Sequence, residues 1–310
     1  MLSDSITEIE RLNKEAEAVR FQNPERALEL AKEAERLAQE QGEKLGLAES
    51  LTIIADVYWR TERYAEGINA AREALSLFTA LDDTRGKARA LNLIGNIHKD
   101  MGEMNQAFHA YQESLKCAEA ISEKKSIAIA LNNIALLYQG FADYSAALEN
   151  YLKSLRLFQE LGDRYSEASV RENIGIIYEL NQEYSNALKE YQAARAVYES
   201  LGLKKETARV LLNTANALEF LNRLEEAKHF CEQAVGLYEE LGSMRGMAIA
   251  KNSLGDICVE KNDYEQALQL YSEALALSEQ VSYKMMPHDT ARALRLRGCK
   301  RGSLMNWLTL

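Results

Sequence analysis

Asparagine is the residue type whose spacing in this chain points most clearly to chemistry. Asn92 and Asn132 lie 40 residues apart, and Asn133, Asn173 and Asn213 follow one another at the same interval. An asparagine amide offers two N–H donors and a carbonyl acceptor, so it can pair with the main chain of an extended peptide whatever its sequence. Asparagine is also a weak helix former, and its repeated use inside predicted helices needs an explanation. The spacing therefore favours a peptide-binding surface.

Motifs of the common catalytic and metal sites are missing from the sequence. There is no phosphate-binding glycine loop, no Gly-x-Ser-x-Gly and no His-Glu-x-x-His. His229 and Cys231 are close in sequence, but residues two apart on a helix do not face each other, so we expect no metal site there. His98 falls in a column of tyrosines and is expected to be a core residue. We therefore expect no enzymatic activity and no cofactor.

Small residues recur at the same interval of 40 and indicate a copied structural unit. One column of small residues is Ala55, Gly95, Ala135, Gly175, Ala215 and Gly255. A second column is Ala27, Gly67, Ala107, Ala147, Ala187, Ala227 and Ala267. Around them apolar residues recur three and four apart, which is the period of an α-helix. Each copy is predicted to be two helices joined by a turn, with the small residues where the helices cross.

Glycines and tyrosines mark the ends and the core of the predicted helices. Glycines that follow an apolar run are expected to end a helix with a positive φ. They are Gly102, Gly162, Gly202 and Gly242. Tyrosines recur in three further columns and could form a stacking site, but their helical spacing favours core packing. The columns are Tyr58, Tyr138 and Tyr178; Tyr64, Tyr144, Tyr184 and Tyr264; and Tyr111, Tyr151, Tyr191 and Tyr271.

The copies resemble the tetratricopeptide repeat over roughly residues 8 to 283, about seven copies. The residues that carry the resemblance in one copy are Leu131, Ile134, Ala135, Tyr138, Tyr144, Ala147 and Tyr151. The copies are 40 residues long where the common repeat has about 34, and no proline closes them. This resembles the longer-helix subclass found in bacterial peptide-pheromone receptors, cell-polarity adaptors and input domains of signalling proteins. The resemblance implies an all-α, right-handed superhelical solenoid whose first helices line a concave groove.

Composition and the ends of the chain set further expectations. We expect a repeat solenoid over residues 1–283 and a C-terminal partial repeat or basic tail over residues 284–310, and the chain could be the front of a longer protein. The net charge of −10 argues against nucleic acid and anionic membranes as partners. The four cysteines are far apart, and neither a signal peptide nor a membrane span is visible, so a cytoplasmic location is expected.

The candidate binding residues lie in the predicted groove. With positions numbered from the small residue of the first helix, positions −6, −3, +1 and +4 share one face because they are three or four residues apart. The candidates there and at the adjoining position −2 are Asn92, Asn96, Asn132, Asn133, Asn173, Asn213, Asn216, Asn252, Arg89, Lys99 and Arg209. The groove is predicted to be partly basic at its start, apolar in the middle and acidic later. The asparagines could instead bond neighbouring helices as spacers between copies.

These expectations favour a non-enzymatic adaptor or sensing module that binds a protein or peptide segment in the groove, in signalling or regulation. Repeats of this kind that grip a terminal carboxylate use lysine at position −3 and basic residues in a later copy. This chain has Asn92 at the first place and Ser169 and Asn173 at the others, which favours an internal peptide segment. The alternative is a structural scaffold that self-associates through its end repeats as a homo-oligomer.

Overall fold

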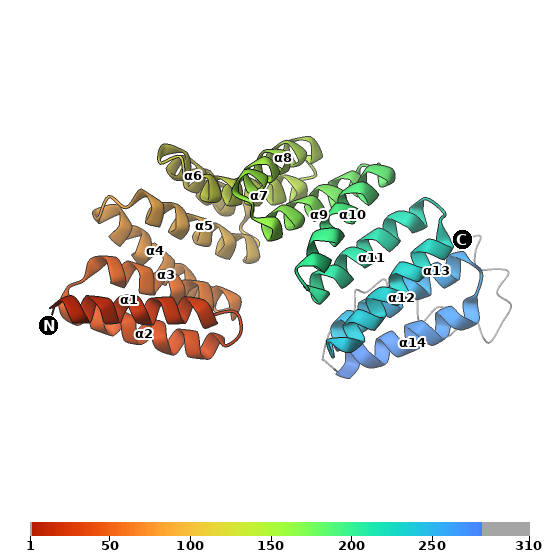
Figure 1. Ribbon diagram of the computed structural model, residues 1–310, viewed down its shortest axis with the longest axis horizontal. Helices are drawn as coiled ribbons and strands as arrows, with labels where there is room; N and C mark the ends of the chain where they lie inside the picture. Colours follow the sequence, from red (N-terminus) through yellow and green to blue (C-terminus); the bar gives the residue numbers. More distant parts are fainter. Residues whose placement is uncertain (1, 281–310) are drawn as a thin grey trace. The chain divides into compact units, whose positions relative to one another are not determined.

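The computed structural model describes residues 2–280, and every regular element within them is an α-helix (Figure 1). The first helices of the copies are α1 (Leu2–Val19), α3 (Lys44–Arg60), α5 (Thr84–Asp100), α7 (Lys124–Gly140), α9 (Arg164–Leu180), α11 (Lys204–Phe220) and α13 (Met244–Glu260). The second helices are α2 (Pro24–Gln41), α4 (Tyr64–Ala80), α6 (Met104–Ala120), α8 (Tyr144–Leu161), α10 (Tyr184–Ser200), α12 (Leu224–Glu240) and α14 (Tyr264–Gln280). The predicted all-α solenoid of helix–turn–helix copies is confirmed.

The chain splits into two compact units, Met1–Gly162 and Asp163–Leu310, called here the N-terminal and C-terminal units. Within each unit, first helices contact the next first helix: α1 with α3, α3 with α5 and α5 with α7 in one, and α9 with α11 and α11 with α13 in the other. Within the described residues, second helices make fewer contacts with one another than successive first helices do. The first helices therefore form the more closely packed layer of each unit, and we call the surface of that layer the inner face.

Turns of one geometry space the helices evenly. From residue 42 to residue 262, one residue in every twenty has a positive φ and ends a helix. The glycines predicted for this role have φ values between 62° and 80°: Gly102, Gly162, Gly202 and Gly242. Asn222 and Asn262 take the same place in other copies, as asparagine can in the left-handed region. A single backbone conformation, repeated every twenty residues, thus sets helix length. Glycine or asparagine favours it in seven of the twelve turns, and the others have Glu62, Asp82, Ser122, Ala142 and Gln182.

Close crossings of the paired helices explain the small residues. A Cβ added at Gly95 would lie 2.4 Å from Cε1 of Tyr111, and one at Gly175 would lie 2.4 Å from Cε1 of Tyr191. These distances are far below van der Waals contact, so the aromatic ring occupies the space that a larger residue would need. The column of Tyr111 is fully buried, and His98 is buried as predicted. Tyrosines of the other two columns are buried or half-buried.

Some expectations from the sequence concern residues that the structure does not describe. The predicted partial repeat or basic tail, residues 284–310, lies outside the described residues, as does Cys299. Within residues 2–280, Cys117, Cys231 and Cys258 are free thiols. None of the described helices has both the length and the apolar composition needed to cross a membrane.

Candidate functional site on the inner face

All of the candidate binding residues lie on first helices, and therefore in the layer of the inner face. In the N-terminal unit they are Arg89, Asn92, Asn96 and Lys99 on α5 and Asn132 and Asn133 on α7. In the C-terminal unit they are Asn173 on α9, Arg209, Asn213 and Asn216 on α11 and Asn252 on α13. The asparagines are half-buried, whereas Arg89 and Arg209 are exposed. Half-buried amides can both bond to neighbouring helices and face a ligand.

Asn133 connects two first helices of the N-terminal unit. Its Nδ2 donates to Oδ1 of Asn92 at 2.8 Å and to Oδ1 of Asn96 at 3.4 Å. The hydroxyl of Tyr111, on α6, also donates to Oδ1 of Asn96, at 2.8 Å. These bonds hold the carbonyl oxygens of Asn92 and Asn96, and no hydrogen bond among the described residues engages their amide nitrogens. Each of the two amides is therefore oriented with two N–H donors left for a ligand.

The two interpretations of the asparagines apply to different residues. Nδ2 of Asn133 is used by α5, and its Oδ1 accepts a hydrogen bond from Asn132 at 3.4 Å. Asn133 is thus the bridge between repeats, as in the spacer interpretation. Asn92 and Asn96 receive that bridge on their oxygens only. Of these three residues, Asn92 and Asn96 keep the amide N–H donors that binding to a peptide main chain requires.

Glu172 organises the corresponding face of the C-terminal unit. This residue is only 4% exposed, and its carboxylate accepts two hydrogen bonds of 2.7 Å from Nε and Nη2 of Arg209. Nδ2 of Asn213 donates to it at 3.1 Å and the hydroxyl of Tyr198 at 3.2 Å. The hydrogen bond to Glu172 raises the pKa of Arg209. The charge of Arg209, which the sequence suggested for ligand binding, is compensated inside the protein.

One register rule underlies both networks. Asn133 and Asn92 are 41 residues apart, and so are Asn213 and Glu172. In each case an asparagine at position −2 donates to the side chain at position −3 of the preceding repeat. These positions are visible in the sequence, but their pairing is not. The signal that could have revealed it is an asparagine 41 residues after a polar residue at −3.

Tyrosine hydroxyls from the second helices hold inner-face side chains in four repeats. Besides the bond from Tyr111 to Asn96, the bonds run from Tyr151 to Gln139 at 3.0 Å, from Tyr191 to Glu179 at 2.8 Å and from Tyr271 to Asp256. The sequence assigned these tyrosines to the core, which is confirmed, but gave no reason to expect the hydroxyl bonds. Burial raises the pKa of Glu179, and the bond from Tyr191 opposes that effect. The same buried tyrosines thus pack in the core and hold polar side chains of the inner face.

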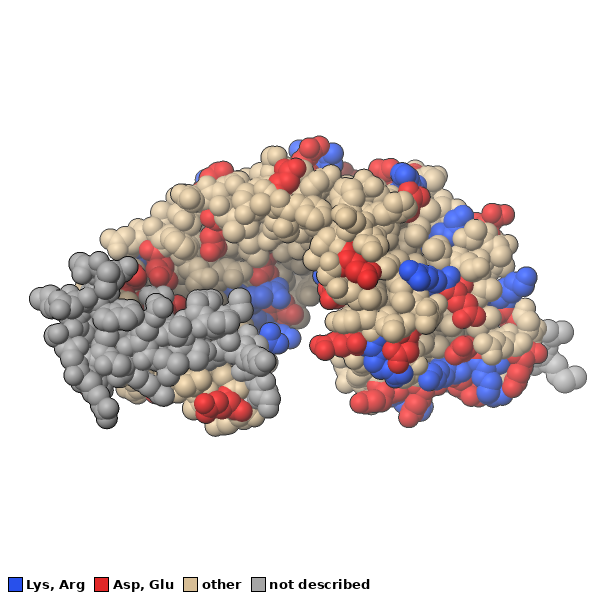
Figure 2. Space-filling model, turned by 180° about the vertical axis from the view of Figure 1, so that it is seen from behind, with Lys and Arg blue, Asp and Glu red and all other residues tan. Residues whose placement is uncertain are grey.

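Charges on the first part of the inner face are paired. Nζ of Lys99 lies 3.0 Å from Asp100, which also accepts a hydrogen bond from the indole of Trp59 at 2.6 Å. Arg89 lies 3.9 Å from Glu17. On the right of Figure 2, where the N-terminal helices lie, acidic and basic side chains are likewise interspersed. Binding there would depend more on hydrogen bonds than on net charge.

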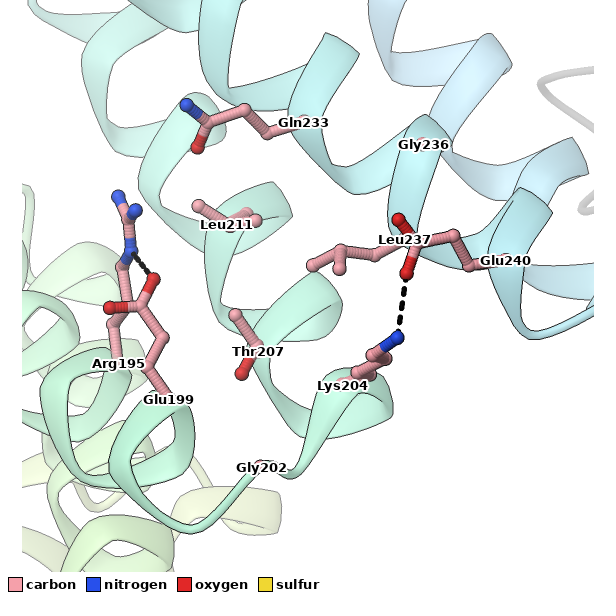
Figure 3. A pocket seen from close by; sticks show the side chains of 10 residues that line it. All are labelled: Arg195, Glu199, Gly202, Lys204, Thr207, Leu211, Gln233, Gly236, Leu237 and Glu240. Carbon is pink, nitrogen blue, oxygen red and sulfur yellow. Dashed lines mark hydrogen bonds and ion pairs between the residues drawn. The ribbon is translucent and has the colours of Figure 1, made fainter.

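A pocket of about 470 Å³ lies away from these residues, between α10, α11 and α12 (Figure 3). Its interior includes Leu211 and Leu237, and two ion pairs border it, Arg195 with Glu199 at 2.6 Å and Lys204 with Glu240 at 2.7 Å. Gly236 also lines it, and a Cβ there would meet no atom within 4 Å, so this side of the pocket borders open space. Both ion pairs are internally satisfied, so the pocket offers chiefly apolar surface.

Within residues 2–280, no group of three or more His, Cys, Asp or Glu side chains could hold a metal ion. His229 instead contacts Gln233, with 2.8 Å between Nε2 and Nε2, while Cys231 is fully buried and burial raises the pKa of its thiol to about 12.

Comparison with protein families gives consistent matches along the chain. One tetratricopeptide repeat model matches residues 86–160, 166–240 and 206–280, and a second matches residues 48–79. The comparison with curated proteins gives no match.

Solved structures of similar fold cover most of the chain at low identity. The apo form of RapI has a TM-score of 0.68 and 16% identity, over 89% of this chain and 99% of RapI. A Rap protein complexed with Competence and Sporulation Factor has a TM-score of 0.61 and 18% identity, over 84% of this chain and 76% of that protein. A signal transduction ATPase from Pyrococcus horikoshii with a tetratricopeptide repeat sensor has a TM-score of 0.73 and 16% identity, over 89% of this chain and 41% of the ATPase. At these identities the likeness concerns the fold alone.

Proposed function

Because this chain belongs to the tetratricopeptide repeat family, we propose that it is a non-catalytic adaptor or regulatory module that binds a protein or peptide segment on its inner face. Repeat solenoids of this kind act by presenting an extended surface. The fold is shared with a Rap protein that was solved in complex with Competence and Sporulation Factor, which supports a binding role.

The hydrogen bonding of Asn92 and Asn96 supports this proposal most directly. Their oxygens are held by Asn133 and Tyr111, and their amide N–H groups donate no hydrogen bond within the described residues, so the amides are oriented before a ligand arrives. Such preorganised donors lose little conformational entropy on binding. The carbonyl groups of an extended peptide main chain are their natural acceptors. The ligand is thus a segment within a chain, recognised in part through its backbone.

We expect the triple replacement of Asn92, Asn96 and Asn132 by alanine to weaken peptide binding without unfolding the protein. Each lost hydrogen bond is worth about 0.5–1.5 kcal/mol, so the combined loss is roughly tenfold or more in Kd. Alanine also has the higher helix propensity, which offsets the lost internal bonds in the folded state. The probe is a linear peptide selected on the full chain from a displayed random library, with its Kd measured by calorimetry and Tm by circular dichroism.

A matched control replaces asparagines of the same unit that lie on second helices, Asn105 on α6 and Asn150 on α8. This control is expected to bind the selected peptide as the unsubstituted chain does. If the inner-face variant unfolds while the control stays folded, the asparagines are spacers. If both variants bind the peptide equally well, the proposed surface is wrong.

A further inference from the structure

A groove runs between the second helices α10 and α12 of the C-terminal unit. Both helices pack on α11 and make far fewer contacts with each other, so α11 forms the floor between them. The pocket of about 470 Å³ lies at one end, where α10 and α12 end (Figure 3), and a second pocket of about 290 Å³ lies where they begin. Arg195 lines both pockets. We call the two pockets together the outer groove.

One face of α11 supplies the floor of the outer groove. Its residues are three and four apart and lie deep in the groove: Thr207, Leu211, Thr214 and Leu218. The hydroxyls of Thr207 and Thr214 donate to carbonyl oxygens of the residues four earlier, at 2.9 and 2.8 Å. The hydroxyl hydrogens of the floor are therefore already used, and the floor is best suited to apolar groups.

Charged side chains around the outer groove compensate one another. Three ion pairs of 2.6–2.7 Å border it, namely Arg195 with Glu199, Lys204 with Glu240 and Arg223 with Glu226. Apolar side chains of the two walls lie between these pairs: Leu188, Phe230 and Leu237. A groove with paired charges attracts neither a basic nor an acidic segment, so it favours an uncharged apolar one.

Gly236 distinguishes this part of α12 from other second helices. At the same position, at intervals of 40 residues, the chain has Ser76, Lys116, Arg156 and Ala196. In α6 and α8 a long cationic side chain thus occupies the place. In α12 the place has no side chain, and a Cβ there would meet no atom within 4 Å. The open side of the larger pocket is therefore not a feature that every repeat shares.

We propose that the outer groove binds an uncharged apolar segment, and that residues 303–310 of this chain are its intramolecular occupant. These eight residues lie outside the described residues and contain no Asp, Glu, Lys, Arg or His. Five of them are apolar: Leu304, Met305, Trp307, Leu308 and Leu310. Leu304, Trp307 and Leu308 have the spacing of three and four residues that is typical of helical anchors in an apolar groove.

The segment just before it does not fit the same groove. Residues 284–301 contain six Lys and Arg and one Asp, and would bring unpaired charge onto apolar surface. The outer groove lies between second helices, so this inference concerns a different surface from the inner face of the proposed function.

Helix direction and chain length both permit this contact. Second helices of successive copies run in the same direction, so α14 ends at Gln280 on the side where α10 and α12 end and where the larger pocket lies. Two helix contacts, α14 on α13 and α13 on α12, separate α14 from the wall of the groove, which is at most about 20 Å. Twenty-four peptide units separate Gln280 from Leu304, and a flexible chain of that length spans on average roughly 25–30 Å.

A tethered segment has an effective concentration in the millimolar range. Residues 303–310 would therefore compete with any separate apolar segment for the outer groove and set a threshold for its binding.

Fluorescence of Trp307 tests the proposal directly. The chain has two tryptophans, so Trp59→Phe leaves Trp307 as the single one in the full chain. We expect its emission at a shorter wavelength, and weaker quenching by acrylamide, than for a synthetic peptide of residues 303–310, because a buried indole is shielded from water and from the quencher. A Trp307 as accessible as in the peptide would overturn the proposal.

A variant that fills the groove locates the binding site. Gly236→Arg, added to Trp59→Phe, introduces the residue that α8 has at the same position. Open space at this position and the higher helix propensity of arginine favour folding, which circular dichroism verifies. We expect the emission and the quenching of Trp307 to become those of the free peptide.

The matched control is Ser76→Arg in the same background, which makes this change on α4 of the N-terminal unit. It should leave the emission and the quenching of Trp307 unchanged. If Trp307 stays protected in the Gly236→Arg variant, or loses its protection equally in the control, the assignment to the outer groove is wrong.

A competition measurement gives an independent test. The probe is a labelled synthetic peptide of residues 303–310, and the protein is the full chain with Leu304, Trp307 and Leu308 replaced by serine. We expect this variant to bind the probe roughly tenfold or more tightly than the unsubstituted chain, because its own segment no longer competes. Adding Gly236→Arg should abolish binding. Added salt should change it little, and strong weakening by salt would contradict an apolar contact.

Protein concentration separates an intramolecular contact from one between two copies. We expect Trp307 to be equally protected at all concentrations, with a monomeric mass by light scattering. Protection that rises with concentration would mean that a second copy supplies the segment, and the intramolecular proposal would be wrong. None of these measurements involves Asn92 or Asn96, so the proposed function of the inner face is tested separately.

Discussion

Replacing Arg209 by alanine is expected to lower the free energy of unfolding by about 3 kcal/mol. Glu172 is buried, and within the described residues Arg209 is its only cationic partner, through two hydrogen bonds of 2.7 Å. Removing one partner of a buried ion pair costs about 3–5 kcal/mol. The lower end of that range applies because the Arg209 side chain is 51% exposed, and water replaces part of its effect. Urea unfolding followed by circular dichroism gives the value.

Two further variants separate this effect from a general loss of charge. Arg89 occupies the same position of another repeat, is exposed and lies 3.9 Å from Glu17, so Arg89→Ala should cost less than about 1 kcal/mol. Adding Glu172→Leu to Arg209→Ala should recover most of the stability, because Leu212 is buried at the equivalent position of the next repeat. A double variant as unstable as Arg209→Ala alone would contradict the account of Glu172.

Gly175→Ala is expected to destabilise the protein by about 1–3 kcal/mol, although alanine normally stabilises a helix relative to glycine. The added Cβ would lie 2.4 Å from Cε1 of Tyr191, whose ring is fully buried and whose hydroxyl is bonded to Glu179. The ring must shift to make room. The repeat that holds Ala135 and a buried Tyr151 at the same two positions accommodates both residues, so we expect a cost at the lower end of that range. Thermal or urea unfolding measures the change.

The same exchange at Gly236 serves as the control. Gly236 lies inside α12, and a Cβ there would meet no atom within 4 Å, so Gly236→Ala should stabilise the protein by about 0.5–1 kcal/mol. Tyr191→Cys added to Gly175→Ala should remove the clash, as in the neighbouring repeat, where Ala215 accompanies a buried Cys231. If both glycine replacements shift stability in the same direction, the packing argument is wrong.

The fold could be predicted from the sequence because its determinants are local and are repeated. A residue that favours a positive φ, such as Gly102, fixes a turn by its own backbone. A small residue such as Gly95 lets the two helices of a copy cross closely, because it leaves room for the ring of a tyrosine sixteen positions later. Both features recur in successive copies, so every copy supports the same assignment of helices and turns.

The candidate site could be predicted only in outline. Helical periodicity assigns Asn92, Asn133 and Arg209 to first helices, and they lie there. It does not say which side chain a residue meets on the neighbouring helix, because that depends on how successive repeats are rotated and spaced. The pairing of Glu172 with Arg209, 37 residues later, is such a case. In the sequence Arg209 looks available to a ligand, but in the structure it is paired with the carboxylate of Glu172.

The position of a bound peptide tests the central claim most directly. A library-selected peptide carrying a photoreactive benzophenone group can be cross-linked to the full chain and the labelled residues identified by mass spectrometry. Asn92 and Asn96 lie on α5 and their bridging partner Asn133 on α7, so we predict labels on these first helices that disappear when unlabelled peptide competes. Competable labels confined to second helices, such as α6 and α8, would contradict binding at the inner face.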